Sequence, residues 1–234
     1  MNANATTFHS REGGSVFMVY ALIFANGDLN DGPTVRAALD RPAPHLIIAA
    51  DGGIRHVYAH GLRPDLVVGD MDSAPHDLLA RAEHDGARIV RHPIDKDETD
   101  LELALLAAAA RDCDPIRVLG ALGNRLDQTL GNVYLLALPD LRGRDTRLID
   151  GQQSAWVVQP GVHAITGEPG DTLSLIPIAG EVTDICTEGL RFPLRRETLY
   201  FGPARGMSNV LIAPQAAISF AEGLLLVVHT IGRA

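Results

Sequence analysis

Cysteine and basic residues are both scarce in this chain of 234 residues. Its two cysteines, Cys113 and Cys186, lie far apart, so they provide neither a disulfide framework nor a cluster of zinc ligands, and they indicate a reducing compartment. The 20 lysines and arginines stand against 29 acidic residues, which leaves a net charge of -9 at pH 7. That balance argues against general binding to nucleic acid or to an anionic membrane. A small charged substrate would need local basic residues or a metal ion.

Long hydrophobic runs are missing as well. The run Val16–Ala25 has ten residues, whereas a helix needs about 20 apolar residues to cross a bilayer. The turn signal Asn26-Gly27-Asp28 follows this run, so we interpret it as the buried first strand of a cytoplasmic protein. Residues 1–15 are rich in Asn, Thr, Ser and Gly, and this composition predicts a disordered tail.

Several common site signatures are also missing. The sequence contains no G-x-x-x-x-G-K-[ST] or G-x-G-x-x-G loop for nucleotides. Its nine histidines show no H-E-x-x-H or similar spacing, so we interpret them as surface or core residues. A phosphate or metal site must therefore be built from other residues.

Up to about Asp150, short apolar runs alternate with helical patterns. The predicted strands are Val16–Ala25, His45–Ala50, Asp65–Gly69, Ala87–Arg91, Ile116–Gly120 and Thr146–Ile149. The predicted helices are Thr34–Leu39, Ile54–His60, His76–Asp85, Asp100–Arg111 and Asp127–Leu138. This alternation predicts an α/β domain over residues 16–150, with a mostly parallel sheet that binds ligands at the carboxyl ends of its strands.

The pattern changes after Gly151-Gln152-Gln153. Residues 151–234 contain brief apolar segments separated by Gly, Pro and Asp clusters, and no helix of useful length is predicted among them. The predicted strands are Ala155–Val158, Thr172–Ile176, Glu181–Ile185, Ala216–Phe220 and Leu224–His229. This spacing is typical of an antiparallel β-sandwich or a closed antiparallel sheet. We therefore expect two domains, each able to bury its own core.

Two short acidic motifs lie where apolar runs stop. In Gly69-Asp70-Met71-Asp72-Ser73, the two aspartates are two residues apart at a strand end. Alternate side chains of a strand point the same way, so both carboxylates could bind one cation. Taken alone, such a motif is more often a solvated turn after a strand.

The second motif is Lys96-Asp97-Glu98-Thr99-Asp100. Thr99 and Glu102 predict a capping box, which places Asp100 in the first turn of a helix, where an ionised acid is favoured. Asp100 could be only a helix-start acid, and Lys96 only a surface ion pair. Beside a helix N-terminus, however, Lys96 is well placed to neutralise a phosphate. Together the two motifs indicate a site for magnesium and polyphosphate.

Weaker signals come from two glycine-containing loops and from the second half. Asp51-Gly52-Gly53 follows a predicted strand, so its amides could approach a ligand closely. The loop Gly120–Asp127 offers Arg125 for a phosphate, or an Arg125–Asp127 pair that only holds the loop. Phe192 and Trp156 are expected in the core from residue statistics alone.

Taken in order, these segments resemble the thiamine pyrophosphokinase family. The matching segments are Ala50–Gly53, Pro64–Ser73, Lys96–Glu102, Gly120–Asp127 and Met207-Ser208-Asn209. The resemblance covers nearly everything after the N-terminal tail. It implies an N-terminal α/β domain, a C-terminal β-sandwich that binds thiamine, and a homodimer with active sites between the subunits. The implied reaction transfers diphosphate from ATP to the hydroxyethyl oxygen of thiamine and releases AMP.

The resemblance also implies roles for individual residues. Asp70, Asp72 and Asp100 would hold Mg²⁺ and the triphosphate of ATP, with Lys96, Asp97 and Thr99 beside them. Asp51 and Gly52 would line the nucleotide or substrate cleft, and Arg125 and Asp127 would complete the phosphate side. Phe192, Ser208 and Asn209 would face thiamine from the β-domain.

The sequence departs from the family pattern at two places. Family members usually have histidine after the loop aspartate, whereas Gln128 follows Asp127 here. Some members stack a tryptophan on the substrate where this chain has Phe192, which keeps the ring face but attracts a cation less strongly.

Phosphoryl-type transfer requires metal on carboxylates, cationic groups on phosphate oxygens and an in-line nucleophile, and this chain has those residue types. Either Asp72 or Asp100 could orient or deprotonate the alcohol. The alternatives are a pyrophosphokinase for another alcohol, such as a hydroxymethylpterin, a nucleotide or thiamine sensor without turnover, and a purely structural β-domain protein.

Overall fold

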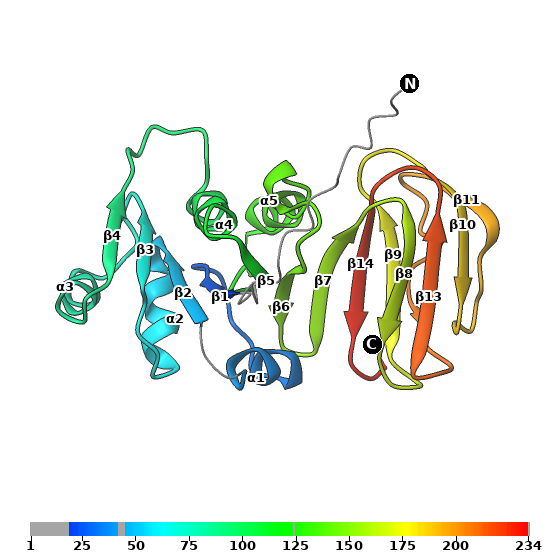
Figure 1. Cartoon of the computed structure of the whole chain (residues 1–234), viewed down its shortest axis with the longest axis horizontal. Coiled ribbons are helices and arrows are strands. Elements are labelled where there is room, and N and C mark those ends of the chain that lie inside the picture. Colours follow the sequence, from blue (N-terminus) through cyan, green and yellow to red (C-terminus); the bar gives the residue numbers. More distant parts are fainter. Residues whose placement is uncertain (1–18, 42–44, 124, 234) are drawn as a thin grey trace, which may run out of the picture.

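The computed structural model describes residues 19–41, 45–123 and 125–233, so the predicted tail at residues 1–15 lies outside them. The first half alternates strands with helices, as the sequence predicts (Figure 1). Its strands are β1 (Val19–Phe24), β2 (His45–Ala50), β3 (Leu66–Gly69), β4 (Arg88–Arg91), β5 (Cys113–Leu119) and β6 (Thr146–Asp150). Its helices are α1 (Pro33–Leu39), α2 (Ile54–Ala59), α3 (His76–His84), α4 (Asp100–Ala109) and α5 (Leu126–Leu135), with 3-10 turns η1 (Asp51–Gly53) and η2 (Pro139–Leu141).

The first six strands are parallel and lie in the order β4-β3-β2-β1-β5-β6. Helices cover both faces of this sheet, so its central strands are apolar on both sides. In β1, for example, every residue from Tyr20 to Phe24 is buried. The chain order reverses between β1 and β5, and such a reversal opens a crevice at the carboxyl ends of the two strands.

The second half contains only strands among its described residues. They are β7 (Gln153–Val158), β8 (Gly161–Thr166), β9 (Thr172–Pro177), β10 (Val182–Glu188), β11 (Arg195–Leu199), β12 (Asn209–Val210), β13 (Gln215–Phe220) and β14 (Leu225–Thr230). β7, β14, β9 and β12 extend the first sheet beyond β6, while β11, β10, β13 and β8 form a second sheet. All of these pairings are antiparallel. This arrangement is the predicted β-sandwich.

One sheet therefore runs through both halves of the molecule. The two residues Gly151 and Gln152 turn the chain from β6 into β7, and the pairing changes there from parallel to antiparallel. Gly151 has a φ of 54°, a conformation that glycine adopts without strain. The predicted boundary at this point thus falls inside a continuous sheet.

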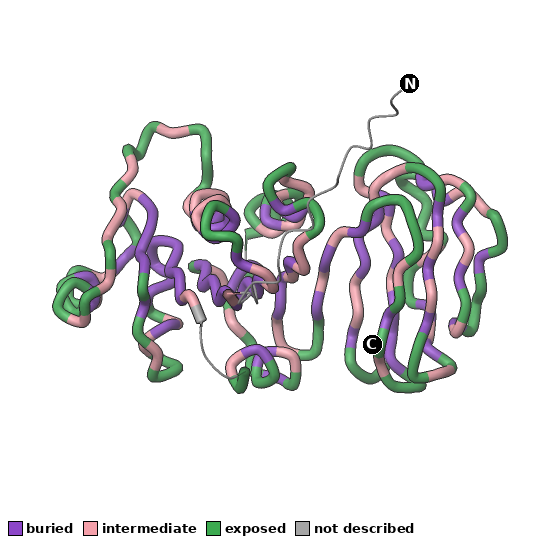
Figure 2. Tube along the Cα trace, in the orientation of Figure 1, coloured by how far each residue is buried: buried purple, intermediate pink, exposed green. Residues whose placement is uncertain are grey.

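Three buried clusters stabilise the fold. Figure 2 shows the buried residues in purple, in both halves of the chain. Alternate residues of β1 divide between the first two clusters, which lie on opposite faces of the parallel sheet. Ile23 packs on the side of α4, whereas Leu22 packs on the side of α1, α2 and α3. The third cluster fills the sandwich and includes Trp156, which is 7% exposed, as predicted.

All of the predicted elements exist, with ends that differ by a few residues. The strand predicted from Val16 is described from Val19, and the helices predicted to end at Arg111 and Leu138 end at Ala109 and Leu135. Three strands were not predicted: β8, β11 and β12. No helix among the described residues is both long and apolar enough to cross a membrane.

Candidate active site

A cavity of about 490 Å³ opens at the carboxyl ends of the parallel strands. It lies at the reversal between β1 and β5, the place where sheets of this kind bind ligands. Its walls come from the loops after β1, β2, β3 and β5, together with the first turns of α4 and α5. The polar residues that line it are Asn26, Asp28, Asp51, Asp70, Asp72, Ser73, Thr99, Asp100, Arg125, Gln128, Thr129 and Asn132.

The loops after β1 and β5 are joined into one wall. The Gly27 amide donates to the Gly120 carbonyl over 2.7 Å, and His56 Nε2 lies 2.8 Å from the Gly27 carbonyl. Asn132, buried on α5, donates its side-chain amide to the Ala121 carbonyl over 2.6 Å. These three bonds join segments that lie 11 or more residues apart in the sequence, so the protein itself holds the cavity wall in place.

Three carboxylates from three different elements meet in this cavity. Asp51, Asp70 and Asp100 each place one oxygen so that all three oxygens lie within 4.8 Å of one another. Asp51 follows β2 and is 4% exposed, Asp70 follows β3, and Asp100 is the first residue of α4. Asp51 has a φ of 45°, a costly conformation for a residue with a side chain.

Gly69 is the residue that allows this close approach. A Cβ atom at Gly69 would lie 2.9 Å from Asp100 Oδ1 and 3.0 Å from Asp51 Cβ. Its φ of 149° is also unfavourable for other residues. Any side chain at this strand end would separate the carboxylates.

The electrostatics of the three acids differ. Burial raises the pKa of Asp51, and the nearby charges of Asp100 and Asp72 act in the same direction, against the Gly52 and Ser73 amides. Burial also opposes ionisation of Asp70, but the Asp72 amide and the Lys96 ammonium outweigh it and lower the pKa of Asp70. The group as a whole concentrates negative charge in a partly closed space.

A hard divalent cation fits this set of donors. Asp51 Oδ1 is buried and has no hydrogen-bond partner among the described residues. Asp100 Oδ1 is buried too, and it lacks a well-directed hydrogen bond although an ammonium lies nearby. Buried carboxylate oxygens left without donors are costly, and Mg²⁺ prefers such oxygens as ligands.

Lys96 is the cation that faces these acids. Its Nζ lies 3.2 Å from Asp70 Oδ2 and 3.1 Å from Asp100 Oδ1, and its side chain is only 10% exposed. Burial acts against the charged ammonium, but the two carboxylates outweigh it and raise the pKa of Lys96. The interaction is thus more than the loose surface ion pair that the sequence left open.

Asp72 does not join Asp70 through strand alternation as expected. β3 ends at Gly69, and Met71 has a φ of 67°, so the chain turns before Asp72. The Asp72 amide donates to Asp70 Oδ1 over 3.1 Å, and Ser73 Oγ donates to Asp72 Oδ1 over 2.8 Å. The Asp72 carboxylate is exposed and lines the cavity outside the group of three.

Other predicted residues surround the same site. Thr99 caps α4 by accepting the Glu102 amide over 3.2 Å, and it lines the cavity. Gly52 is buried and does not line the cavity, although its neighbour Asp51 does, and a Cβ atom at Gly52 would lie 2.4 Å from Asn26 Oδ1. Asp97 is exposed on the loop between β4 and α4.

Arg125 and Asp127 form an ion pair at the start of α5. Arg125 Nη2 donates to Asp127 Oδ2 over 2.6 Å, and both side chains are about two thirds exposed. Arg125 and Gln128 line the cavity. The loop-holding pair that the sequence allowed is therefore present, and the guanidinium can still reach a ligand.

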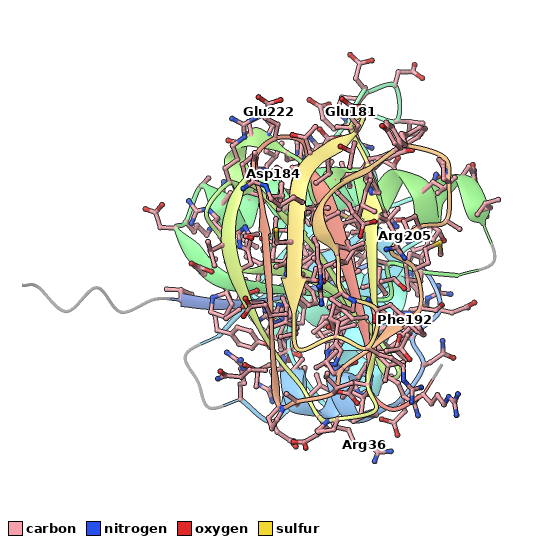
Figure 3. All side chains as sticks on the ribbon, turned by 90° about the vertical axis from the view of Figure 1, so that its right-hand side faces the viewer. Arg36, Glu181, Asp184, Phe192, Arg205 and Glu222 are labelled. Carbon is pink, nitrogen blue, oxygen red and sulfur yellow. The ribbon has the colours of Figure 1, made fainter. Side chains whose placement is uncertain are left out.

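The residues predicted to face thiamine, Phe192, Ser208 and Asn209, do not line this cavity. A smaller cavity of about 190 Å³ is lined by Phe192 and Asn209 together with Leu194, Ala204, Arg205, Gly206 and Met207. Figure 3 shows Phe192 and Arg205 on the same side of the β-domain. Phe192 is 56% exposed, so the expectation from residue statistics that it lies in the core is wrong.

Asn209 fixes the backbone beside this smaller cavity. Its Oδ1 accepts the amides of Phe192 and Val210, and its Nδ2 donates to the Phe192 carbonyl over 2.8 Å. Because Asn209 is 4% exposed and its amide is used in these bonds, its evident effect is to present the Phe192 ring. The Ser208 amide donates to Ser174 Oγ over 3.0 Å.

Several residues of the larger cavity carry no sequence signal that would single them out. Asn26, Asp28, Ser73 and Asn132 line it, yet each is a polar residue of a type common in loops or helices. Asp51 was expected to line the cleft, but its place among the three clustered carboxylates depends on how β2, β3 and α4 pack. That information is not carried by local sequence spacing.

Comparison with known proteins agrees with this geometry. Residues 42–147 match the family model for the catalytic domain of thiamin pyrophosphokinase, and residues 162–225 match the model for its vitamin B1 binding domain. The chain is also 30% identical over 209 residues to thiamine pyrophosphokinase of Bacillus subtilis. The aligned region covers 89% of this chain and 97% of that protein. The chain belongs to the thiamine pyrophosphokinase family. Thiamine pyrophosphokinase 1 of Arabidopsis thaliana is a further relative, 26% identical with 88% of this chain and 84% of that protein covered.

Solved structures of family members share the fold. The crystal structure of the Bacillus subtilis thiamine pyrophosphokinase superposes with a TM-score of 0.81 at 27% identity, covering 91% of this chain and 99% of that one. The crystal structure of a thiamin pyrophosphokinase from Geobacillus thermodenitrificans superposes with a TM-score of 0.78, also at 27% identity. It covers 91% of this chain and 97% of that one. The likeness to the family therefore extends over both halves of the chain.

Proposed function

We propose that this protein transfers the diphosphate group of ATP to the hydroxyethyl oxygen of thiamine, which yields thiamine diphosphate and AMP. Membership of the family supports the reaction. The observation that carries the proposal is the meeting of Asp51, Asp70 and Asp100 in one cavity, with a buried Asp51 oxygen left without a partner. Carboxylates gathered in this way suit Mg²⁺ and a polyphosphate substrate.

Each side of the cavity has a proposed task. Asp51, Asp70 and Asp100 hold Mg²⁺, which neutralises charge on the phosphate oxygens when it is bound. Arg125, exposed at the rim, contacts the triphosphate, and Lys96 supplies the second cationic group. As the family resemblance implies, Asp97 and Thr99 lie beside the metal and the triphosphate, and Asp127 completes the phosphate side. The Asp51-Gly52 turn lines the nucleotide or substrate cleft.

Asp72 is the group that we assign to the alcohol. The sequence left Asp72 and Asp100 as candidates for orienting or deprotonating the hydroxyethyl oxygen. Asp100 belongs to the clustered carboxylates and is paired with Lys96, whereas Asp72 lines the cavity outside that cluster. An exposed carboxylate held by Ser73 can accept a hydrogen bond from a substrate hydroxyl without giving up a metal ligand.

The complete site is proposed to lie between two copies of the chain. The larger cavity is lined only by residues of the first half, and the smaller one only by residues of the second half. Both halves of the chain expose apolar side chains. In the first half these are Leu126, Leu130 and Tyr134 on α5, and in the second half they include Phe192 and Met207 beside the smaller cavity. A dimer would cover these surfaces and place Phe192 of one copy over the carboxylates of the other.

Phosphorus NMR of the purified protein with ATP, Mg²⁺ and thiamine tests the reaction. Equal amounts of AMP and thiamine diphosphate are expected. If ATP stays intact, or if AMP forms only with a hydroxymethylpterin in place of thiamine, the proposed acceptor is wrong. We also propose a cytoplasmic location, supported by the two free cysteines Cys113 and Cys186.

A further inference from the structure

Lys96 is the only lysine in the chain. Of the 20 lysines and arginines, all the others are arginine. Arginine forms ion pairs at least as well as lysine, and the described residues contain many arginine–carboxylate pairs. A lysine at the carboxylate cluster of a chain whose other basic residues are all arginine points to a property that arginine lacks.

The property that distinguishes an ammonium here is that it is small and carries a point charge. Its three donors rotate freely, whereas the planar guanidinium binds carboxylates in a fixed, bidentate manner. Lys96 Nζ contacts Asp70 Oδ2 and Asp100 Oδ1 at 3.2 and 3.1 Å, and it does so from a loop rather than from a helix or strand. Such a group can leave one set of oxygens and bind another with little rearrangement of the backbone.

The ammonium faces Asp70 Oδ2 and Asp100 Oδ1, two carboxylate oxygens that are also open to a metal ion shared by Asp70 and Asp100. Magnesium binds oxygen ligands at about 2.1 Å, so the ion would lie closer to both carboxylates than Nζ does. A divalent cation and an ammonium at this separation repel each other. The two cations therefore compete for Asp70 and Asp100.

We propose that Lys96 is a displaceable counter-ion, which neutralises Asp70 and Asp100 while the metal is absent and moves to the nucleotide phosphates when the metal binds. This inference rests on the proposed function. It gives the carboxylates, whose oxygens lie within 4.8 Å of one another, a cationic partner whenever no metal is bound. It also couples the two ligands, because a displaced ammonium gains a partner only when the triphosphate is present.

The single lysine makes the displacement directly observable. In protein labelled with ¹⁵N at the lysine side chain, one ammonium signal is expected, protected from exchange by its two carboxylates. Mg²⁺ alone should broaden or shift this signal. Mg²⁺ together with α,β-methylene ATP, in which the bond broken in the proposed reaction is replaced, should restore a sharp signal at a new position.

Calorimetry supplies the matching affinities. Mg²⁺ should bind Lys96→Met at least about tenfold more tightly than the unaltered protein when no nucleotide is present, because a competing unit charge is gone. Lys96→Gln, which is neutral but still donates hydrogen bonds, should bind Mg²⁺ more tightly in the same way. Agreement between the two variants would show that the gain does not come from a structural effect of the methionine side chain. Arg91→Met is the charge-matched control, since Arg91 is exposed and pairs only loosely with Glu83 at 3.8 Å. It should leave Mg²⁺ affinity unchanged.

The outcomes separate this inference from the proposed function. If Mg²⁺ binds while the ammonium signal stays unchanged and neither Lys96 variant gains affinity, the inference is wrong and the reaction can still stand. If the displacement occurs but no thiamine diphosphate forms, the inference holds and the reaction is wrong. If neither the unaltered protein nor the variants bind Mg²⁺, both the metal site and the displacement are overturned.

Discussion

Asp51 and Asp72 both border the larger cavity, but we assign them different roles: Asp51 binds the metal ion, and Asp72 contacts the alcohol. Only Asp51 joins Asp70 and Asp100 in the cluster. Replacing Asp51 with Asn should weaken Mg²⁺ binding by about a hundredfold, since ligand charge sets the affinity of sites for hard cations. Replacing Asp72 with Asn should lower kcat by about a hundredfold or more through loss of the group at the alcohol, with little change in the Mg²⁺ requirement.

Steady-state rates measured over a range of Mg²⁺ concentration and pH distinguish the two. High Mg²⁺ should restore much of the activity of Asp51→Asn and none of that of Asp72→Asn. Rescue of Asp72→Asn by Mg²⁺ would show that Asp72 is a ligand and would contradict the assignment.

Gly69 provides a test of the packing between the acids. Gly69→Ala should reduce stability by about 1–3 kcal/mol, the range for a residue forced into an unfavourable φ, and it should also weaken Mg²⁺ binding by separating Asp51 from Asp100. Gly86→Ala is the matched control, because Gly86 has a φ of 92° and no atom within 4 Å of its added Cβ. Urea unfolding and Mg²⁺ calorimetry on both variants are the measurements. Equal loss of Mg²⁺ affinity in the two would contradict the steric explanation.

Residue chemistry near the site could be predicted in part. The positions of Asp70, Lys96 and Asp100 at strand and helix ends predicted that they would gather at one edge of the sheet, and they do. What spacing could not predict was the geometry of Asp72, because it depends on the positive φ of Met71. A left-handed turn after a strand reverses the face on which the next side chain lies, and methionine gives no local signal for such a turn.

At the scale of the elements, Asp171 connects the start of β9 to the end of β14. It precedes β9 and is 4% exposed, and its carboxylate accepts the Glu168 and Gly232 amides and lies 2.8 Å from His229 Nε2. Burial alone would raise the pKa of Asp171, but these amides and His229 outweigh it and lower the pKa below its ordinary value of 3.8. Asp171 should therefore stabilise the ends of β9 and β14.

A lowered pKa in the folded state fixes the sign of the pH dependence. The stabilisation by Asp171 should be present in full above the pKa of the unfolded chain and should disappear as the pH falls through the lower folded value. Asp171→Asn should cost about 1–3 kcal/mol at pH 7, the range for a buried hydrogen-bonded group that loses its partners. Urea unfolding of both proteins from pH 7 down to pH 3 measures this. A difference that grows toward low pH would contradict the assignment.

The three strands that the sequence did not reveal have a common cause. β8 and β11 are the edges of the four-stranded sheet, and β12 is an edge of the ten-stranded sheet. Edge strands bury few side chains: in β8 only Ile165 is buried, and in β11 only Leu199. Without alternating apolar residues there is no period-2 pattern to detect. The central strands, which are buried on one or both faces, were all predicted.

At the scale of the whole molecule, the apolar face of α5 has a testable role. Leu126, Leu130 and Tyr134 are spaced four residues apart, so they share one face of the helix, and they are 71%, 48% and 54% exposed. If a second copy covers this face, Leu130→Glu should convert a dimer into a monomer and abolish activity, because a charge buried at an interface is unfavourable. Light scattering after size exclusion measures the mass. Arg36→Glu, on the exposed Arg36 of α1, serves as a surface control and should remain dimeric.

The position of the site between subunits can be tested by mixing inactive proteins. Asp70→Asn damages the carboxylate cluster, and Phe192→Asp damages the exposed ring beside the smaller cavity, so neither homodimer should be active. After mixing in equal amounts and exchange, half of the dimers contain one copy of each, and one of their two sites has both parts intact. About a quarter of the unaltered activity should return, as two-fold symmetry requires. Mixing Asp70→Asn with Asp100→Asn should restore nothing, because every site then contains a damaged cluster. Failure of the first mixture to recover activity, with mixed dimers verified by mass spectrometry, would mean that each chain completes its own site.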